Sequence, residues 1–532
     1  MATSQSENAR NGAIGSPDGV RGAPRTSLFV SLFSARGWVT VTMLVTGLAI
    51  WRLAFVSAGV DPDSDAYGHH AIARQILVNP RDLSVHWVWL PFFHYAQAIA
   101  IAFGATLQSV RLLNVGLGAA IPLLLYGFLR RNRVLGPEHG LDAAPTVAAV
   151  IAALSPISMQ MGTTGQTEPL FGFLVLSTVL AMAYGRHHLA ALALSIAVLL
   201  RYEAWSIPPA IAAFLVLARL PWVRARLLPS ERLTNTWRDL LPVIAPVFAI
   251  LVWATIRRVA DGSWFQFLHK TREFANGAMG AKSSFALGPS QVLEDLCKYA
   301  IVVPWRVVGY PLFLAPFGIV RTLRREGLRF FLVYLALLSF VTLTWMLRSS
   351  LGLDRHFVVL VPFYATMIAN GIVAIGMFVD DLVKKPVGAS VHAFAASGAS
   401  RAAVIAGLSC AVIGNTWGIL EIWMRDWRNA SLGAWPDRRE IAAKLRELDG
   451  VVFCDEPTVE ILSGADRHRF DRRGLDDKKA PGWVRAAVAT GKPVYVATWA
   501  VKLPKLGVHG PILARSPGTS GDTGFVLMRV EP

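Results

Sequence analysis

Long apolar stretches recur along most of this 532-residue chain and limit what it can fold into. Stretches near or above 18 apolar residues are typical of membrane-spanning helices. Hydrocarbon offers no partner to a backbone N–H or C=O group, so each stretch must be helical. Only 16% of the residues are charged, against about 25% in a soluble domain. These features predict an all-α polytopic membrane protein.

About eleven spans are expected from these stretches. They lie near residues 38–58, 109–129, 144–162, 168–184, 188–200, 203–219, 240–259, 300–320, 329–347, 356–379 and 402–423. Arg and Lys collect in alternate connections, the bias that cytoplasmic loops show. The pattern predicts a multi-pass protein of the inner or plasma membrane. Its N-terminus would be cytoplasmic, its C-terminus outside, and two long outer loops would cover about 59–108 and 260–299.

The two ends of the chain differ from the middle. Residues 1–36 are rich in Ser, Gly, Asn and Arg, and we expect a disordered cytoplasmic tail. Residues 37–425 hold the spans. A helical pattern opens at Pro436, and strand patterns follow at 451–454, 493–498 and 525–529. Residues 426–532 are therefore expected to form a small soluble α/β domain outside the membrane.

One apolar stretch in the first outer loop, residues 87–104, is not expected to be a span. It begins Trp-Val-Trp-Leu-Pro-Phe-Phe-His, and aromatic residues at this density favour the membrane interface. We expect a helix lying at the interface. His86 and His94, in the same loop, are expected to be interfacial residues.

Charge and cysteine content exclude two classes of protein. The net charge is +17, which in a soluble protein would suggest nucleic-acid binding. Here the basic residues fall in the predicted cytoplasmic loops, so no nucleic-acid partner is expected. The three cysteines, Cys297, Cys410 and Cys454, form neither a disulfide framework nor a zinc-binding spacing.

Ionisable residues gather on the predicted outer side. The run Asp61-Pro62-Asp63-Ser64-Asp65 follows the first span directly. Further groups stand at the outer ends of later spans, namely Glu168, Arg201, Glu203, Arg348, Asp354, Arg355 and His356. Ionisable groups at membrane depth are costly and usually functional, so we expect these residues to form one site.

The three carboxylates at alternate positions repel one another unless a cation or a proton relieves them. If a helix starts near Ser64, Asp65 and His69 share one face, which suits a general base and its orienting partner. Asp63 and Asp65 would equally suit a divalent cation such as Mg²⁺ or Mn²⁺. The structural alternative is that Asp61 and Asp63 cap a helix and face solvent.

The outer arginines are candidates for binding phosphate. Arg201, Arg348 and Arg355 each offer a planar fork that matches phosphate oxygens. Their alternative role is contact with lipid headgroups. Glu168 and Glu203 gain nothing from anionic headgroups, and ion pairing with the arginines is their alternative role.

Five short motifs, in this order and on this side, carry a family resemblance. They are Asp65-Ala66-Tyr67 with Ala71-Ile72-Ala73-Arg74, then Trp89-Leu90-Pro91-Phe92-Phe93-His94 with Arg111-Leu112-Leu113-Asn114, then Thr167-Glu168-Pro169-Leu170-Phe171, Arg201-Tyr202-Glu203-Ala204-Trp205, and Asp354-Arg355-His356 before Val361-Pro362-Phe363. Over about residues 38–425 the chain resembles the GT-C membrane glycosyltransferases, in particular relatives of protein O-mannosyltransferases and of the aminoarabinose transferase of lipid A.

The resemblance implies transfer of a sugar, mannose or another hexose, from a polyprenyl-phosphate carrier to a glycan, lipid or protein acceptor, with inversion. It implies Asp65 as base, with Asp63 as the other candidate. The substrate-binding residues that it implies are Tyr67, His69, Glu168, Arg201, Glu203, Arg355 and His356. Arg355 and Arg201 would stabilise the leaving phosphate. The Trp-Trp-Asp motif of oligosaccharyltransferases is missing from the sequence, which disfavours N-linked transfer.

A second interpretation is a transporter or flippase for a lipid-linked glycan or another anion. Transporters place ionisable residues near the bilayer midplane and often contain inverted repeats. In this chain the charges cluster at one predicted surface and no repeat is visible. A third interpretation is a scaffold whose C-terminal domain binds a partner.

Overall fold

The computed structural model describes residues 36–134, 143–383 and 399–531, apart from residues 87, 229–230, 232, 234–236, 281, 472–474, 476–477 and 517–523. The predicted disordered tail lies outside the described residues, apart from its last residue. The fold class is confirmed: a membrane protein of many apolar helices with a small C-terminal sheet.

Six helices of the described residues are long and apolar enough to cross a membrane. They are α2 (Arg36–Ala58), α5 (Leu107–Val134), α12 (Leu241–Asp261), α18 (Leu328–Met346), α19 (Val361–Val383) and α21 (Ala399–Leu432). Helix α19 is central, because 89% of its apolar window is buried in the protein. Helices α12 and α21 expose most of their apolar side chains, with only 22% of their windows buried, which is the surface that lipid covers.

Shorter apolar helices fill the space between the long ones. They are α6 (Ala144–Leu154), α7 (Pro156–Met161), α8 (Glu168–Ala183), α9 (His187–Val198) and α10 (Ile207–Leu217), the last preceded by the 3₁₀ turn η2 (Tyr202–Ser206). The predicted span 144–162 is divided at Ser155, because Pro156 opens a second helix and proline cannot continue the first.

The predicted span 300–320 was wrong as a single helix. After α15 (Pro289–Cys297) of the preceding outer loop, the chain there forms the π turn η5 (Lys298–Val302), α16 (Val303–Val308), the 3₁₀ turn η6 (Tyr310–Leu314) and α17 (Ala315–Arg325). Gly309 has a φ of 76°, which ends α16, and Pro311 stands directly inside the next turn. Positive φ and a missing N–H group interrupt a helix that hydropathy alone would continue.

The outer loops contain short helices. The first holds α3 (Ser64–Val78), the turn η1 (Leu83–His86) and α4 (Phe92–Ala102). Helix α4 has 11 residues, about 16 Å at 1.5 Å per residue, and is too short to cross the roughly 30 Å hydrocarbon core. The second loop holds α13 (Gln266–Met279) and α14 (Ser284–Leu287).

The C-terminal part is a five-stranded sheet of order β2-β1-β3-β5-β4. Strand β1 (Val451–Cys454) runs parallel to β2 (Phe470–Asp471) and to β3 (Val494–Trp499), and β5 (Phe525–Val530) runs antiparallel to β3 and to β4 (Ile512–Arg515). The three strands predicted from sequence are β1, β3 and β5. The helices around the sheet are α22 (Pro436–Arg446), α23 (Pro457–Ser463), α24 (Ala480–Val488) and α25 (Leu503–Leu506).

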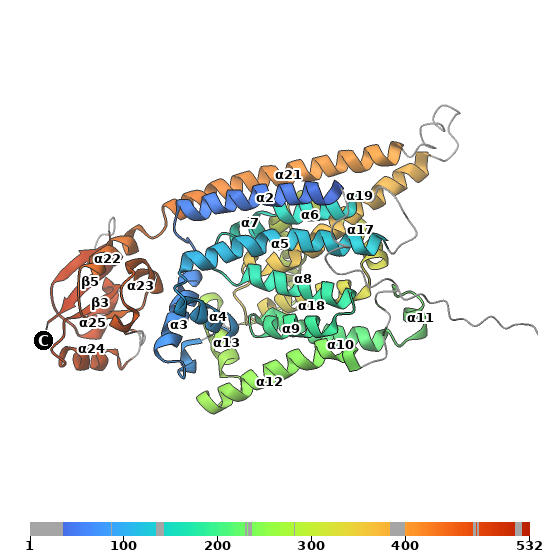
Figure 1. Cartoon of the computed structure of the whole chain (residues 1–532). Coiled ribbons are helices and arrows are strands. Elements are labelled where there is room, and N and C mark those ends of the chain that lie inside the picture. The colour runs from blue at the N-terminus through green and yellow to red at the C-terminus, as the bar shows by residue number, and fades with distance from the viewer. Residues whose placement is uncertain are drawn as a thin grey trace, which may run out of the picture.

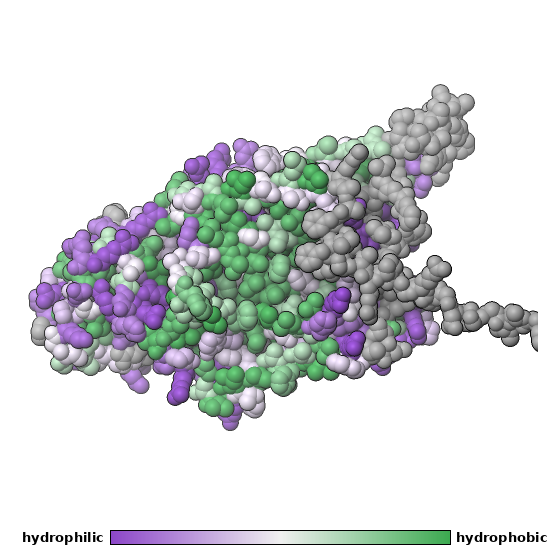
Figure 2. All heavy atoms as spheres, viewed as in Figure 1, coloured by the Kyte–Doolittle hydropathy of each residue, from purple (hydrophilic) through white to green (hydrophobic). Residues whose placement is uncertain are grey.

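Figure 1 shows how these parts are arranged. The sheet lies at one end of the helical bundle, beside α3, and the short helix α11 (Pro221–Arg224) lies at the opposite end. Figure 2 shows hydrophobic residues over the middle of the bundle and hydrophilic ones over the sheet. Contacts join the sheet region to the bundle: Arg74 of α3 pairs with Glu460 of α23 at 3.4 Å and donates to the Ala465 carbonyl at 2.7 Å.

Candidate active site

Most of the predicted ionisable residues form one row of alternating charges. Two do not join it, because Arg348 pairs with Asp295 at 3.6 Å and Asp354 with Arg306 at 3.4 Å. Arg355 contacts the carboxylates of Asp63, at 2.8 Å, and of Asp65. The Nε atom of Arg355 lies 3.5 Å from Glu168. Glu168 also accepts from Arg201, at 2.6 Å. Residues from four separate parts of the chain thus meet in a single network.

The row continues through Arg201. Its guanidinium binds Glu203 through two nitrogens, at 2.8 and 3.2 Å, and donates to Thr167 Oγ1 at 2.9 Å. Glu203 in turn lies 3.5 Å from His356 Nδ1. A two-nitrogen contact of this kind fixes the plane of both groups. Four carboxylates and two guanidinium groups make up the row, so its formal charge is negative.

The acidic run is held by its own hydrogen bonds. Asp61 Oδ1 accepts from the Asp63 N–H at 3.1 Å, and Asp63 caps α3 by accepting from the Asp65 N–H at 3.0 Å. Capping of this kind satisfies an N–H group that has no partner inside the helix. Asp63 therefore caps α3 and also pairs with Arg355, whereas the carboxylate of Asp65 points to Arg355 from the first turn of the helix.

Asp61 is an anchor and does not face solvent. It is 1% exposed. Its Oδ2 accepts from the Gly165 N–H at 2.6 Å and lies 3.8 Å from Arg111 Nε. Burial raises the pKa of Asp61 to about 7, against the pull of Arg111. This carboxyl group ties the acidic run to the loop that precedes Glu168.

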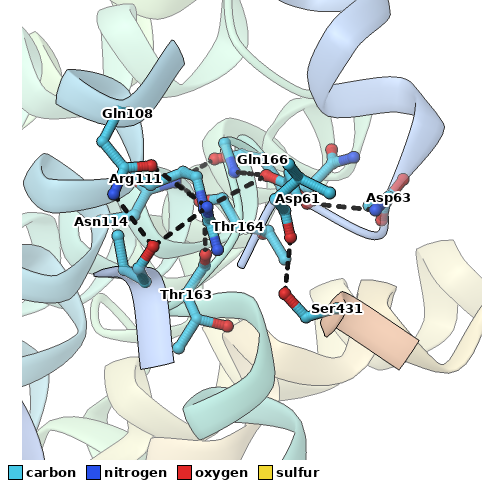
Figure 3. A network of polar contacts seen from close by, with 12 residues as sticks. Asp61, Asp63, Gln108, Arg111, Asn114, Thr163, Thr164, Gln166 and Ser431 are labelled. Atoms are coloured by element: carbon cyan, nitrogen blue, oxygen red, sulfur yellow. Dashed lines mark hydrogen bonds and ion pairs between the residues drawn. The ribbon is translucent and has the colours of Figure 1, made fainter. Parts of the chain in front are cut away.

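Side chains of helix α5 hold the backbone at residues 59–61 and at residues 163–166, and Figure 3 shows Arg111 and Asn114 beside these two segments. Arg111 donates to the carbonyls of Thr163 and Gly59, each at 2.8 Å. Asn114 donates to the carbonyls of Thr164 and Gln166, at 2.8 and 2.7 Å. The motif Arg111-Leu112-Leu113-Asn114 thus places two buried donors one helical turn apart, where they hold irregular backbone that would otherwise lack partners.

Three buried histidines lie behind the row. His69 Nδ1 is 2.8 Å from His94 Nε2, and His94 Nδ1 is 2.8 Å from His86 Nδ1. Burial lowers the pKa of His69 and of His86 to about 4, so both are neutral near pH 7. The hydrogen bond of His69 is with His94, whereas the sequence suggested Asp65 as its partner. The expectation that His86 and His94 are interfacial residues was wrong, because both are buried in this chain of rings.

A cavity of about 660 Å³ opens over the row. Asp65, His69, Glu168, Arg201, Glu203, Arg355 and His356 all line it. The lining also includes apolar side chains, among them Phe265, Leu268, Phe274, Phe340 and Val341. The cavity therefore offers both charged groups and apolar surface to a ligand.

Two predicted site residues lie apart from the cavity lining. Asp63 contacts Arg355 and the Asp65 N–H group but does not line the cavity. Tyr67 is buried against Leu107, and its ring meets the edge of Trp435 with centroids 6.3 Å apart. The sequence missed Arg272 of α13, which lines the cavity. Basic residues are usually concentrated in cytoplasmic loops, so an arginine in a predicted outer loop is unusual. This unusual position could have identified Arg272 as a candidate from the sequence.

The geometry gives no support to a metal at Asp63 and Asp65. The guanidinium of Arg355 already provides the cation that these carboxylates need. Within the described ranges, no group of three His, Cys, Asp or Glu residues is placed to hold a metal ion. Because Mg²⁺ is often held by only one or two carboxylates together with substrate phosphates and water, a divalent cation at Asp63 and Asp65 stays a prediction.

The arrangement was compared with known proteins. No family model and no curated protein match the chain. Among solved structures, ArnT from Cupriavidus metallidurans bound to undecaprenyl phosphate superposes with a TM-score of 0.57 at 14% identity, covering 93% of this chain and 98% of that one. The chain has the GT-C fold of ArnT. The apo state of ArnT gives a TM-score of 0.54 at 13% identity, covering 92% and 97%.

The likeness to ArnT extends beyond the helical bundle. With 93% of the chain covered, the superposition must include part of the C-terminal sheet as well as the long helices. The GT-C fold that the motifs suggested is therefore confirmed. At 14% identity the likeness concerns the fold, and the chemistry has to be argued from the site itself.

Proposed function

We propose that this protein is a membrane glycosyltransferase that moves a sugar, mannose or another hexose, from a polyprenyl-phosphate carrier to an acceptor, with inversion. The observation that carries the proposal is a cavity lined both by a row of charged groups and by apolar side chains. A carrier of this class has a phosphate and a sugar at one end and a long hydrocarbon chain at the other. ArnT, which has the same fold, was crystallised with undecaprenyl phosphate, and this supports the choice of carrier.

The reaction takes place, in this proposal, on the outer face of the membrane. The row of charges lies at the end of the bundle that carries α3, and the arginine-rich connections around α11 lie at the other end (Figure 1). If the arginine-rich end is cytoplasmic, the cavity and residues 426–532 lie outside. Residues 37–425 then form the transmembrane part, although α21 continues past this boundary to Leu432.

Asp65 is the proposed general base. It lines the cavity, and its side chain keeps 33% of its surface exposed, more than Asp63 at 15%. The Asp65 carboxylate takes the proton of the acceptor hydroxyl group, whose oxygen attacks the anomeric carbon of the donor sugar. The bond from that carbon to the phosphate oxygen breaks, and the bonding electrons leave with polyprenyl phosphate. Attack opposite the leaving group inverts the configuration.

The leaving phosphate needs a cationic partner, and the two arginines of the row are already paired with carboxylates. Arg201 and Arg355 are engaged by four carboxylates. Arg272 lines the same cavity from α13, and no described carboxylate lies within ion-pairing distance of it. We therefore assign the leaving phosphate to Arg272. Arg201 and Arg355 hold the carboxylates in place and complete the sugar side of the site, with Glu168, Glu203, His69 and His356.

The test uses purified protein with a radiolabelled polyprenyl-phosphate-mannose donor. Release of polyprenyl phosphate is measured for the wild type, for Asp65→Asn and for the control Asp426→Asn, whose side chain is 70% exposed on α21. General-base catalysis contributes roughly 10²- to 10⁴-fold to rate, so Asp65→Asn should lose activity on this scale and the control should not.

Other outcomes have distinct meanings. Full activity in Asp65→Asn with loss in Asp63→Asn would move the base to Asp63. Absence of turnover with mannose, glucose and aminoarabinose donors, together with lipid-linked sugar crossing liposome membranes, would replace the enzyme by a flippase.

A further inference from the structure

A second cavity, of about 960 Å³, lies between the C-terminal sheet and the outer loop of the bundle. The bundle lines it with residues of α3, η1 and the segment before α4, including Trp89. The C-terminal part lines it with residues of β1, β2, α23 and α24. The contacts of Arg74 with Glu460 and with the Ala465 carbonyl hold these two walls together.

The sheet presents a binding position at this cavity. Strand β1 lies between β2 and β3 and is parallel to both, so the chain leaves β1 in opposite directions to form its neighbours. Ligands of open α/β sheets bind at the carboxyl ends of strands where the strand order reverses in this way. Cys454 and Asp455, at the end of β1, and Asp471, at the end of β2, line the cavity.

The lining combines aromatic rings with hydrogen-bonding groups. Trp89, Phe470 and Trp483 supply rings, and four carboxylates and Arg469 supply acceptors and donors. Aromatic faces pack against the C–H faces of sugar rings, and carboxylate oxygens accept from sugar hydroxyl groups. This combination suits a saccharide.

Ion pairs make an uncharged ligand the better fit. Glu460 is paired with Arg74 at 3.4 Å, and Asp455 with Lys502 at 2.6 Å. A paired carboxylate attracts a further cation weakly, yet its remaining lone pairs still accept hydrogen bonds. A basic peptide would therefore gain less here than a hydroxyl-rich neutral ligand, and a phosphorylated ligand would be repelled by the carboxylates.

The two cavities share a wall. Trp89 lines both, and its ring packs against His69 of the first cavity with centroids 4.7 Å apart. A chain of sugars in the second cavity would thus end beside the proposed catalytic cavity. We propose that the second cavity binds a neutral oligosaccharide, which is the acceptor of sugar transfer. The role as acceptor rests on the proposed function, whereas the binding of a saccharide at this position does not.

The test measures saccharide binding directly. Full-length protein in lipid nanodiscs, which avoid the sugar headgroups of maltoside detergents, is titrated with maltotriose and with mannotriose and followed by saturation-transfer NMR. We expect binding by the wild type and by Asp65→Asn. Trp483→Ala should weaken binding about tenfold, the scale of one lost ring contact, and Trp483→Phe should retain most of it. Asp471→Asn should weaken binding without removing a ring. Trp222→Ala, at a tryptophan 62% exposed on α11, is the matched control.

The outcomes separate this inference from the proposed function. Saccharide binding that depends on Trp483, in a protein without transferase activity, would keep the binding site and reject the enzyme. Transferase activity without trisaccharide binding, or binding unchanged in both Trp483→Ala and Asp471→Asn, would overturn the saccharide site. Binding of trilysine in place of the trisaccharides would make the cavity a peptide site.

Discussion

The pairing of Arg111 with Asp61 offers a direct test of how the site is held together. Arg111→Met keeps much of the side-chain volume and removes the guanidinium. Without the guanidinium, the carbonyls of Thr163 and Gly59 lose a hydrogen-bond donor, and the buried Asp61 carboxylate loses its cationic partner. The partner variant is Asp61→Asn, and the double variant completes a mutant cycle.

The expected loss of stability follows from burial. Removing one partner of a buried ion pair costs roughly 3–5 kcal/mol. The lower end is expected here, because the pKa of Asp61 is already raised to about 7, and the carboxyl group can take a proton when its cation is gone. The double variant removes both charges, so its loss should fall short of the sum of the two single losses by roughly 1–3 kcal/mol.

Thermal unfolding in detergent and sugar transfer are the two assays. A loss of 1 kcal/mol lowers the unfolding midpoint by roughly 2–4 °C in a domain of 150–250 residues and by less in a longer chain. A fall of about 5 °C is therefore expected for Arg111→Met. Transfer should fall by about 10²-fold, because the two loops carry Asp65 and Glu168 and a shift of about 1 Å is enough for such a loss. Unfolding midpoints that stay unchanged in the variants, with stability losses in the double variant that equal the sum of the single ones, would refute the anchoring role of Arg111 and Asp61.

Three further predictions concern single positions. The folded state keeps a proton on Asp61 up to about pH 7, whereas the unfolded chain loses it near pH 4. The thermal unfolding midpoint of the wild type should therefore fall relative to that of Asp61→Asn as the pH rises from about 4 to 7, and then level off. A difference between the two midpoints that stays constant with pH would contradict the raised pKa. Arg272→Gln should raise KM for the donor roughly 10- to 100-fold, as loss of a hydrogen bond to a charged group predicts, with the exposed Arg258→Gln as control; equal KM values would remove Arg272 from the phosphate site. In Gly165→Ala the new Cβ would lie 2.6 Å from Leu107 Cδ1, so turnover should fall and be restored by adding Leu107→Ala, and unchanged turnover in the single variant would show that this contact is not limiting.

Much of the fold could be predicted from hydropathy, because backbone groups in hydrocarbon leave only the helix available. The spans near 144–162 and 300–320 were exceptions, because Pro156 divides the first, and Gly309 and Pro311 interrupt the second, in apolar stretches that hydropathy cannot divide. In the C-terminal part, β1, β3 and β5 were visible as apolar runs. Strand β2 has only two residues, too few for an alternating pattern, and β4 exposes Ile512, so neither showed the signal of a buried strand.

The sequence alone determined which ionisable residues belong at one end of the bundle, because the order of spans and connections assigns each motif to a side. Only the tertiary structure decided how those residues are paired. Arg355 meets Asp63 across 292 positions of the chain, and no local pattern carries that information. Packing also separated the three aspartates into a buried anchor, a helix cap and a carboxylate that lines the cavity. Equal side chains in one short run acquire different chemistry because burial and neighbouring charges, which arise only on folding, set the state of each.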